Sequence, residues 1–228
     1  MIIILLAFML IGWLVQMRLR SKFKTYGAIG LEAGLSGAEI ADRMLHSYGI
    51  RDVKIQSVPG KLTDHYNPVD KTVNLSPEVY EGRSISAAAV AAHECGHAVQ
   101  HATAYRWLQV RSALVPAVSF ANRGLGILFM VMLFGSFVVK MFPMETVLWV
   151  IIALQSAITL FTVVTLPVEY DASRRAMVWL KQTRTATVAE QDKAQDALKW
   201  AANTYLVAAL ASVTQLAYYV MMLLGNRD

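Results

Sequence analysis

The segment "TVLWVIIALQSAITLFTVVTLPV", residues 146 to 168, contains 23 consecutive residues and no charged side chain. An α-helix rises about 1.5 Å per residue and the hydrocarbon core of a bilayer is about 30 Å thick, so about 20 residues are enough to cross it. Residues 204 to 224 form a second uncharged run of sufficient length. Both runs therefore predict transmembrane helices.

Two shorter apolar runs occupy residues 2 to 17 and 124 to 139. Each of these needs help from flanking residues, such as Trp13, Lys140 or Phe142, to cross the bilayer. The chain of 228 residues is 56% hydrophobic and only 16% charged, a composition that is atypical of a soluble domain. The sequence thus predicts an α-helical membrane protein with about four transmembrane helices.

The first apolar run sets the predicted orientation. No basic segment precedes it and no small-residue cleavage site follows it, so we expect an uncleaved anchor rather than a signal peptide. The basic stretch "MRLRSKFK", residues 17 to 24, comes directly after the run. Because basic residues concentrate at the cytoplasmic ends of transmembrane helices, the N-terminus is expected outside and Arg18 to Lys24 inside.

Counting crossings from this start divides the cationic residues unevenly. Residues 18 to 123 hold 13 Lys and Arg and residues 167 to 203 hold 6, which places 19 of the 21 on the cytoplasmic side. Lys140 and Arg227 are left outside. This distribution accounts for the net charge of +5 without a nucleic-acid partner, and no stripe of aromatic and basic residues suggests one. The lipid bilayer is the partner that the sequence predicts.

A small soluble fold is predicted after the first apolar run. Residues 35 to 48 predict a short amphipathic helix, because Ser36 and Glu39 have the spacing of a capping box. Partial alternation and turn residues then predict three short strands, in residues 53 to 58, 61 to 66 and 72 to 76.

The stretch "AAVAAHECGHAVQHATAY", residues 88 to 105, predicts a helix that begins at Ser84 or Ser86 and carries a metal site. His93 and His97 lie one turn apart on one face, where two imidazoles can bind the same Zn²⁺ ion. Glu94 is rotated from His93 by about 100°. It can therefore flank the metal, hold a water molecule and take its proton.

Two other residues of this stretch are set aside as ligands. His101 lies about 12 Å from His93 along a helix axis, too far to bind the same ion, so a supporting or surface role is expected. Cys95 is two residues from both His93 and His97 and points away from their shared face, which predicts a small packing residue. As the single cysteine of the chain, it also excludes an intramolecular disulfide.

A catalytic zinc usually has three protein ligands and an open position, so a third ligand has to come from elsewhere. Glu39 and Glu190 sit in predicted capping boxes, and Glu145 falls on the outer side of the membrane. Glu32 lies near the first apolar run, and Glu78 and Glu81 come shortly before the histidine helix. Glu169 remains, in "TLPVEYDASRRA" at residues 165 to 176. Two spans separate it from the histidine helix and return the chain to the same side. Glu169 is therefore the predicted third ligand.

The residues around Glu169 carry two further expectations. Pro167 favours a helix start or a kink at this point. Asp171 is two residues beyond Glu169 and points elsewhere on a helix, from where it can orient a ligand histidine. That Asp171 is itself the third ligand is the alternative. Downstream, Thr187 and Glu190 form a second capping box that opens a polar helix running into the last apolar run.

Several long stretches resemble one family. They are "TDHYNP" (63–68), "VNLSPEVYEGRSISAAAVAAHECGHAVQH" (73–101), "LPVEYDASRRA" (166–176) and "KWAANTYLVAAL" (199–210). They are similar to the YugP-like membrane zinc metallopeptidases of bacteria, the zinc peptidase 2 family, over nearly the whole chain. The resemblance implies a bacterial inner-membrane protein with a neutral zinc peptidase domain. It also implies that His93, His97 and Glu169 bind Zn²⁺ and that Glu94 is catalytic.

The predicted function is hydrolysis of peptide bonds at the cytoplasmic face of the membrane, with a peptide or a membrane protein as substrate. Two alternatives are kept: a membrane scaffold with a structural or vestigial zinc site, and an intramembrane protease of the site-2 type. The predicted fold adds a zincin-like, gluzincin-type catalytic helix and a small β-sheet to the four spans. The predicted parts are an anchor (1–17), a cytoplasmic zincin-like region (18–123), a transmembrane hairpin (124–168), a cytoplasmic helical region (169–203) and a last span with its tail (204–228).

The residues that contact a substrate are less defined. Zincins often bind a peptide as an added strand at a sheet edge, and "TVNLS", residues 72 to 76, is the candidate edge. An ordinary structural strand is the alternative interpretation. Asp64, His65 and Tyr66 can stabilise an oxyanion or can form a polar turn, and the sequence does not decide between these roles.

Overall fold

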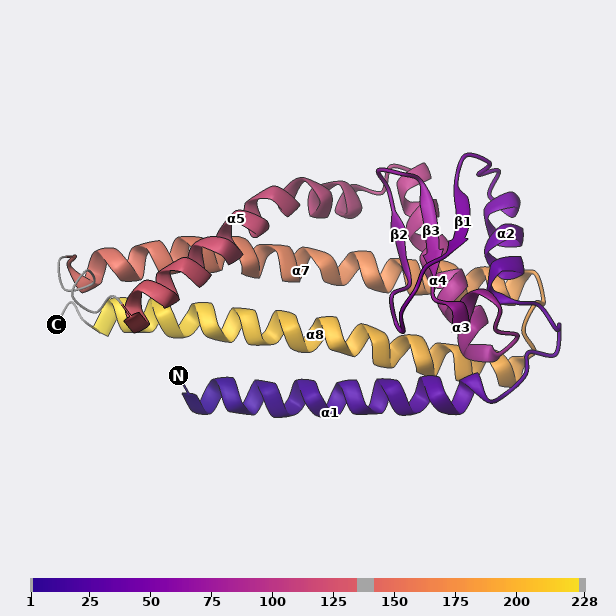
Figure 1. The fold of residues 1–228 in the computed structure, drawn as a ribbon, viewed down its shortest axis with the longest axis horizontal. Coiled ribbons are helices and arrows are strands. Elements are labelled where there is room, and N and C mark those ends of the chain that lie inside the picture. The colour runs from indigo at the N-terminus through magenta and orange to yellow at the C-terminus, as the bar shows by residue number, and fades with distance from the viewer. Residues whose placement is uncertain (1, 135–141, 226–228) are drawn as a thin grey trace. The chain divides into compact units, whose positions relative to one another are not determined.

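The computed structural model describes residues 2–134 and 142–225 (Figure 1). Parts of the predicted second span, of the loop at residues 140 to 145 and of the C-terminal tail lie outside these residues. The described chain is mostly helical and contains one small sheet. Its elements are α1 (Ile2–Gly27), α2 (Gly37–Ser47), β1 (Lys54–Ser57), β2 (His65–Asn67), β3 (Thr72–Leu75), α3 (Pro77–Tyr80), α4 (Ile85–Ala102), α5 (Arg106–Phe134), α7 (Met144–Gln182) and α8 (Val188–Gly225).

Four of the helices, α1, α5, α7 and α8, are long and apolar enough to cross a membrane. This confirms the prediction of about four candidate spans beside a small sheet. The helices are longer than the apolar runs from which they were predicted, because flanking polar residues belong to the same helices. Pro167 lies inside α7 rather than at a helix start. Glu169 therefore stands on the same continuous helix as the third apolar run.

The chain divides into two compact units, and the long helices contribute to both. The first unit consists of Met1–Gly12, Val110–Leu166 and Tyr205–Asp228. Large apolar side chains on its described helices are exposed, as expected for lipid-facing surfaces. Inside it, α7 and α8 are joined by buried polar groups: Gln155 Nε2 donates to Ser212 Oγ at 3.2 Å, and Thr159 Oγ1 lies 2.8 Å from the same oxygen. Such bonds hold helices together where no water competes.

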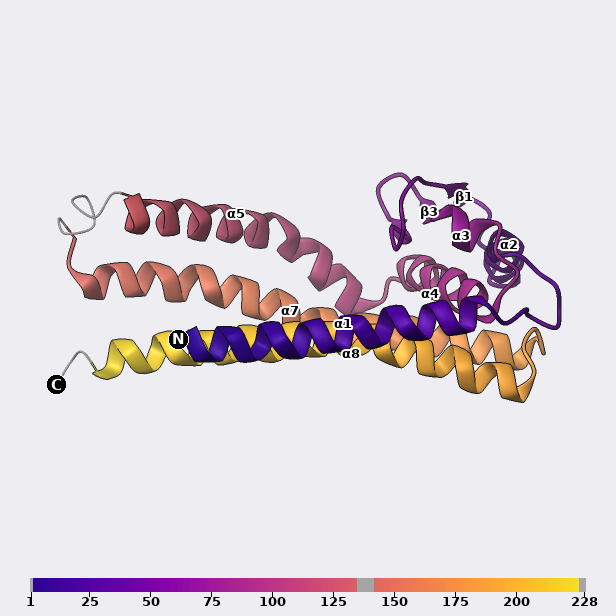
Figure 2. The same ribbon diagram turned by 60° about the horizontal axis from the view of Figure 1, so that its bottom comes forward.

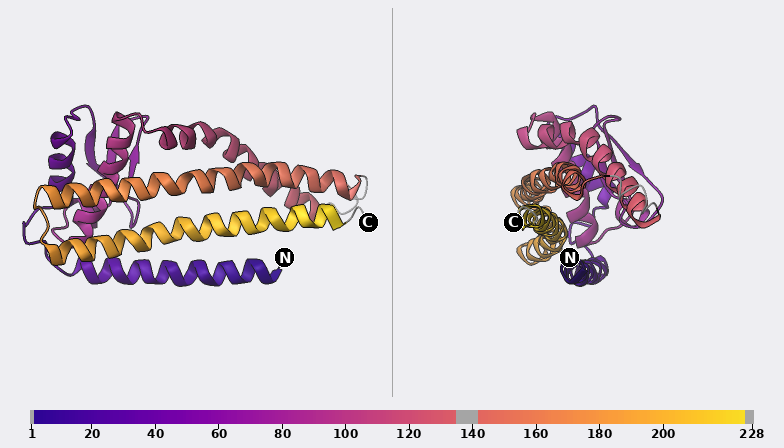
Figure 3. Two further views of the ribbon diagram at one scale, coloured as in Figure 1. Left: turned by 180° about the vertical axis from the view of Figure 1, so that it is seen from behind. Right: turned by 90° about the vertical axis from the view of Figure 1, so that its left-hand side faces the viewer.

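The second unit consists of Trp13–Gln109 and Pro167–Thr204. α4 lies at its centre, with the sheet, α2 and α3 gathered on one side of it (Figure 2). Views from other directions show that α7 and α8 run side by side and antiparallel (Figure 3). The core of this unit is formed by the small apolar residues of α4 together with side chains from α2 and β3, among them Ile40, Met44 and Leu75, which are fully buried.

Local sequence signals account for the boundaries of α2 and α4. The predicted capping box at α2 is present, because Ser36 Oγ accepts from the Glu39 N–H and Glu39 Oε2 accepts from the Ser36 N–H. At α4, Ser84 is the N-cap residue and its hydroxyl accepts from the Ala87 N–H at 3.2 Å. α4 ends at Ala102, slightly before the predicted end near Tyr105.

The sheet has the strand order β1-β3-β2. β3 pairs in parallel with β1 and antiparallel with β2, and all four of its residues are buried. The prediction that residues 72 to 76 form a sheet edge is therefore wrong. The connection before β2 returns the chain to one side of β3, while β1 covers the other side. The edges are β1 and β2, and β2 starts later than predicted, at His65.

Candidate metal centre

Two helices bring three donor groups together. His93 and His97 come from α4 and Glu169 comes from α7, where the two helices cross. Glu169 Oε2 lies 3.4 Å from His93 Nε2 and 3.6 Å from His97 Nε2. One ligand atom from each of the three residues lies within 4.8 Å of the other two, and the Glu169 and His97 side chains are buried.

The chemistry of this donor set suits zinc. Imidazole nitrogens and a carboxylate oxygen are among the groups that bind Zn²⁺ in proteins, and three protein donors with one open position are typical of catalytic zinc. The described residues contain this one group of at least three His, Cys, Asp or Glu side chains close enough to hold a metal ion. The residues present therefore fit the ion that the sequence predicts.

Gly96, in the middle of the motif, explains how α7 comes so close to the histidines. A Cβ atom on Gly96 would lie 2.6 Å from the Ala172 carbonyl oxygen of α7, a separation that real Cβ atoms do not adopt. The absence of a side chain at Gly96 thus allows the backbones of α4 and α7 to touch. Ala172 is three residues after Glu169, so this contact lies one helical turn from the carboxylate.

Both histidines are oriented through their Nδ1 atoms. His97 Nδ1 lies 3.0 Å from Gln100 Oε1, and His93 Nδ1 lies 3.1 Å from Ser173 Oγ. Since Gln100 Oε1 can only accept, His97 carries its proton on Nδ1 and directs the lone pair of Nε2 toward Glu169. Such partners of ligand histidines fix the ring and raise its basicity.

Gln100 belongs to a longer chain of hydrogen bonds. Its side chain is fully buried, and its Nε2 donates to the Val168 carbonyl at 2.8 Å and to Asp171 Oδ2 at 3.0 Å. Asp171 in turn accepts from Arg174 and from Arg175, the latter at 2.5 Å. The sequence predicted that Asp171 can orient a ligand histidine. The structure places Gln100 between Asp171 and His97, so any such effect passes through this amide.

The other predicted residues have clear positions. Glu94 is buried beside the histidines, and its carboxylate forms no hydrogen bond within residues 2–134 and 142–225. Cys95 is fully buried, and burial raises the pKa of its thiol well above the ordinary value, which suits a packing residue. His101 Nδ1 lies 2.7 Å from the Tyr66 hydroxyl, away from the metal group. Burial raises the pKa of Tyr66 to about 12.

The charge of Glu169 acts on His97. Burial lowers the pKa of His97, but the nearby negative charges of the Glu169 and Glu94 carboxylates together outweigh it. The net effect raises the pKa of His97 above its ordinary value. A carboxylate that stabilises positive charge on a buried imidazole also favours a cation bound between them.

Residues 1–224 match the model of a family described as "Putative neutral zinc metallopeptidase". The chain belongs to this zinc metallopeptidase family. It is also 40% identical over 214 residues to the "Putative membrane protease YugP" of Bacillus subtilis (strain 168), a match that covers 93% of this chain and 92% of the relative. No solved structure matches the chain.

Membership in the zinc metallopeptidase family agrees with the donor set where α4 and α7 cross. The family resemblance that the sequence motifs suggested is thereby confirmed. The relative's name describes a membrane protease, and the four apolar helices of this chain are consistent with a multi-pass membrane protein.

Sequence reasoning missed Gln100 and Ser173 as parts of the site. Each carried a spacing signal: Gln100 is three residues after His97, and Ser173 is four residues after Glu169. A polar side chain one turn from a predicted ligand is a candidate partner for a ligand histidine. What the spacing cannot show is that Ser173 serves a histidine on the other helix.

We expect Gln100→Leu to weaken zinc binding by about 10–100-fold, the range typical for loss of a partner of a ligand histidine. Leucine has a similar volume but cannot accept the hydrogen bond from His97 Nδ1. The measurement is competition of the purified protein against a zinc chelator of known affinity. Gln191→Leu is the control, because Gln191 is a glutamine of α8 whose amide bonds only the Ala186 carbonyl. Equal affinity of wild type and Gln100→Leu would contradict this role.

Proposed function

We propose that this protein is a membrane-embedded zinc endopeptidase that hydrolyses peptide bonds at the cytoplasmic face of the bacterial inner membrane. The observation that carries the proposal is the convergence of His93, His97 and Glu169 next to a buried, unbonded Glu94 within the described chain. Family membership supports the reaction class. Membrane proteins, or segments that emerge next to the membrane, are the proposed substrates.

In this proposal His93, His97 and Glu169 hold the zinc ion. When bound, zinc supplies a Lewis acid that lowers the pKa of a coordinated water to about 7 and polarises a carbonyl group. Gln100 and Ser173 keep the two imidazole rings in the orientation that directs Nε2 inward. The low exposure of the site keeps bulk water away from the reacting groups.

Glu94 is the proposed general base and general acid. Its carboxylate takes a proton from the attacking water and passes it to the leaving amine, so the same group acts first as a base and then as an acid. Its neighbours on α4 fix its position, because the helix places it about 100° from His93. The Glu94 side chain is buried.

The polypeptide substrate is proposed to add to the sheet at β2. β2 is an edge strand, and it lies against α4, with Tyr66 of β2 next to His101 of α4. An extended peptide at this edge would gain backbone hydrogen bonds without requiring a particular sequence. β2 takes the place of β3 as the proposed binding edge, because β3 is the central strand of the sheet.

The cytoplasmic location rests on the charge distribution. Of the 21 Lys and Arg residues, 19 fall on the side that follows α1 when the four runs are crossed in order. Among the described residues, α4 is not one of the helices with the length and composition of a membrane span. This favours a site beside the membrane over one inside the hydrocarbon core.

The test is metal dependence of cleavage. We expect the purified full-length protein in lipid nanodiscs to cleave an unfolded membrane-protein substrate, to lose that activity after removal of zinc by 1,10-phenanthroline, and to regain it on addition of Zn²⁺. Cleavage is measured by mass spectrometry of the fragments. Zinc-loaded protein that cleaves no substrate would favour a scaffold with a structural zinc site. Cleavage that survives complete zinc removal would contradict the proposal.

A further inference from the structure

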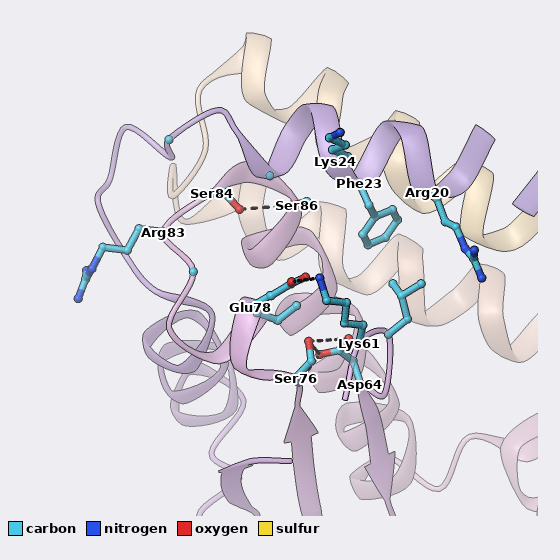
Figure 4. A pocket seen from close by; sticks show the side chains of 15 residues that line it. Arg20, Phe23, Lys24, Lys61, Asp64, Ser76, Glu78, Arg83, Ser84 and Ser86 are labelled. Carbon is cyan, nitrogen blue, oxygen red and sulfur yellow. Dashed lines mark hydrogen bonds and ion pairs between the residues drawn. The ribbon is translucent and has the colours of Figure 1, made fainter. Parts of the chain in front are cut away.

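A cavity that the metal ligands do not line lies in the second unit. Its volume is about 960 Å³, and it is enclosed by the end of α1, the loop before β2 and the loop before α4 (Figure 4). α1 contributes Arg20, Phe23, Lys24 and Gly27. The spacing of three, four and seven residues places all four on one face of the helix.

The acidic residues of the cavity are already bonded. Asp64 Oδ1 accepts from the Ser76 N–H at 2.7 Å and from the Ser76 hydroxyl at 3.1 Å. Glu78 Oε1 lies 2.7 Å from Lys61 Nζ. Glu78 is therefore neutralised by Lys61, and the Asp64 carboxylate is occupied by hydrogen bonds from Ser76.

The cations of α1 differ from the other charged groups of the cavity. Arg83 is engaged by Glu39 and by a backbone carbonyl, and Figure 4 shows it pointing away from the cavity. Within the part of the chain that the structure describes, Arg20 and Lys24 form neither a hydrogen bond nor an ion pair. The cavity is thus lined by two cations, one helical turn apart, that form no ion pair in the described chain, and by one carboxylate, Asp64, that is bonded to neutral donors.

The opposite face of α1 contacts α8. Asp196 of α8 accepts from the Tyr26 hydroxyl at 2.6 Å and lies 2.8 Å from Lys22 Nζ. These contacts dock the end of α1 on α8. Arg20, Phe23 and Lys24 lie on the other side of α1 and line the cavity, and Figure 4 shows the Phe23 and Arg20 side chains reaching toward it.

Position along α1 places the two cations at the membrane surface. The apolar run ends at Met17, so Arg20 is about 4.5 Å and Lys24 about 10.5 Å further along the helix axis. The headgroup region extends about 5–7 Å beyond the hydrocarbon core on each side. Arg20 therefore lies at headgroup depth and Lys24 just beyond it.

The same face of α1 is apolar on the membrane side of these cations. Trp13 and Met17 precede Arg20 by seven and three residues, and they are 58% and 47% exposed. One face thus offers an exposed apolar strip followed by two cations and a cavity. A free phosphate ion has no apolar group that could cover this strip. A phospholipid has acyl chains for the strip and a phosphate for the cations.

We propose that this cavity binds the headgroup of an anionic phospholipid. The phosphate binds beside Arg20, and Lys24 adds a second positive charge one helical turn further on. The polar part of the headgroup enters the cavity beside Phe23, and the acyl chains follow Trp13 and Met17. Basic pockets at the cytoplasmic ends of transmembrane helices bind anionic headgroups in this way. The lipid binds the docked end of α1, beside the loops that precede β2 and α4.

The experiment is native mass spectrometry of the detergent-purified full-length protein with dioleoylphosphatidylglycerol or dioleoylphosphatidylcholine. We expect preferential retention of phosphatidylglycerol by wild type. Its affinity should fall about fivefold in Arg20→Gln and about 25-fold in the Arg20→Gln/Lys24→Gln double variant. The double exchange Arg20→Lys/Lys24→Arg keeps both charges and should restore binding. Thermal melting and zinc content report whether each variant is folded.

Arg18→Gln is the matched control. Arg18 is an exposed cation of the same helix, close to the same depth, and it does not line the cavity. We expect its affinity for phosphatidylglycerol to stay within about twofold of wild type. An equal loss in Arg18→Gln, or equal retention of both lipids by wild type, would overturn the proposal. Displacement of the lipid by an equal concentration of glycerol phosphate would assign the cavity to soluble phosphates instead.

Discussion

Glu94→Gln is expected to lower kcat by about 10²–10⁴-fold, the usual contribution of a positioned general base, while the zinc content stays at the wild-type level. Glutamine has nearly the same size and shape as glutamate, so the packing of the buried side chain on α4 is retained. Its amide cannot accept the proton of the attacking water. The donor atoms of His93, His97 and Glu169 are not altered by the exchange.

Two measurements on the same purified sample are needed for Glu94→Gln: metal analysis and the rate of substrate cleavage. Glu81→Gln serves as the control. Glu81 is an exposed glutamate just before α4, and its exchange removes the same negative charge. We expect wild-type activity from it. Loss of zinc together with activity in Glu94→Gln would show that Glu94 holds the metal or the fold rather than the proton. Undiminished cleavage would remove Glu94 from the mechanism.

The metal group is where the sequence was most informative. The spacing of His93 and His97 follows from helix geometry alone, and Glu169 follows from counting the crossings that return the chain to one side. Neither inference requires knowledge of how α4 and α7 touch. The capping box at Ser36 and the N-cap at Ser84 are equally local, which is why the predicted boundaries agree with the structure there.

Features that depend on the contact between elements were not predicted. Ser173 bonds to a histidine 80 positions away in the chain, and no spacing within α7 reveals which helix it faces. Gly96 looked like a spacer within the motif, and only the nearby Ala172 carbonyl shows why a side chain is excluded. The prediction that residues 72 to 76 form a sheet edge failed for the same reason. Whether β3 is central depends on where the connections run, and three short alternating segments do not determine that.

One of the two expectations at Pro167, a helix start, is wrong, and Glu169 nevertheless lies close to His93 and His97. Pro167 favoured a helix start or a kink, and α7 continues through it from Met144 to Gln182, so the helix start is wrong. Pro167 has no N–H to donate to the Val163 carbonyl four residues earlier, a loss that helices in membrane proteins tolerate. Around this position Gln100 donates to the Val168 carbonyl, and Tyr105 donates to that of Pro167 at 3.5 Å. α4 and the residues after it thus bond to the backbone next to Glu169.

Glu169→Gln should weaken zinc binding by more than the roughly 10–100-fold expected for loss of an outer partner of a ligand, because it alters a donor itself. The amide keeps the volume of the side chain but removes the negative charge that balances the cation. His93 and His97 would remain as two neutral donors on one helix. We therefore expect little zinc after dialysis and no cleavage at low free zinc.

Zinc content by metal analysis and affinity by chelator competition measure the effect of Glu169→Gln. Asp192→Asn is the control, because Asp192 is an exposed carboxylate of α8 and its loss changes the net charge equally. Thermal melting of the zinc-free proteins separates metal loss from unfolding: similar melting of the two zinc-free forms shows that the variant is folded. A folded Glu169→Gln protein that retains wild-type zinc affinity would remove Glu169 from the ligand set. The third donor would then have to come from another group near the crossing of α4 and α7.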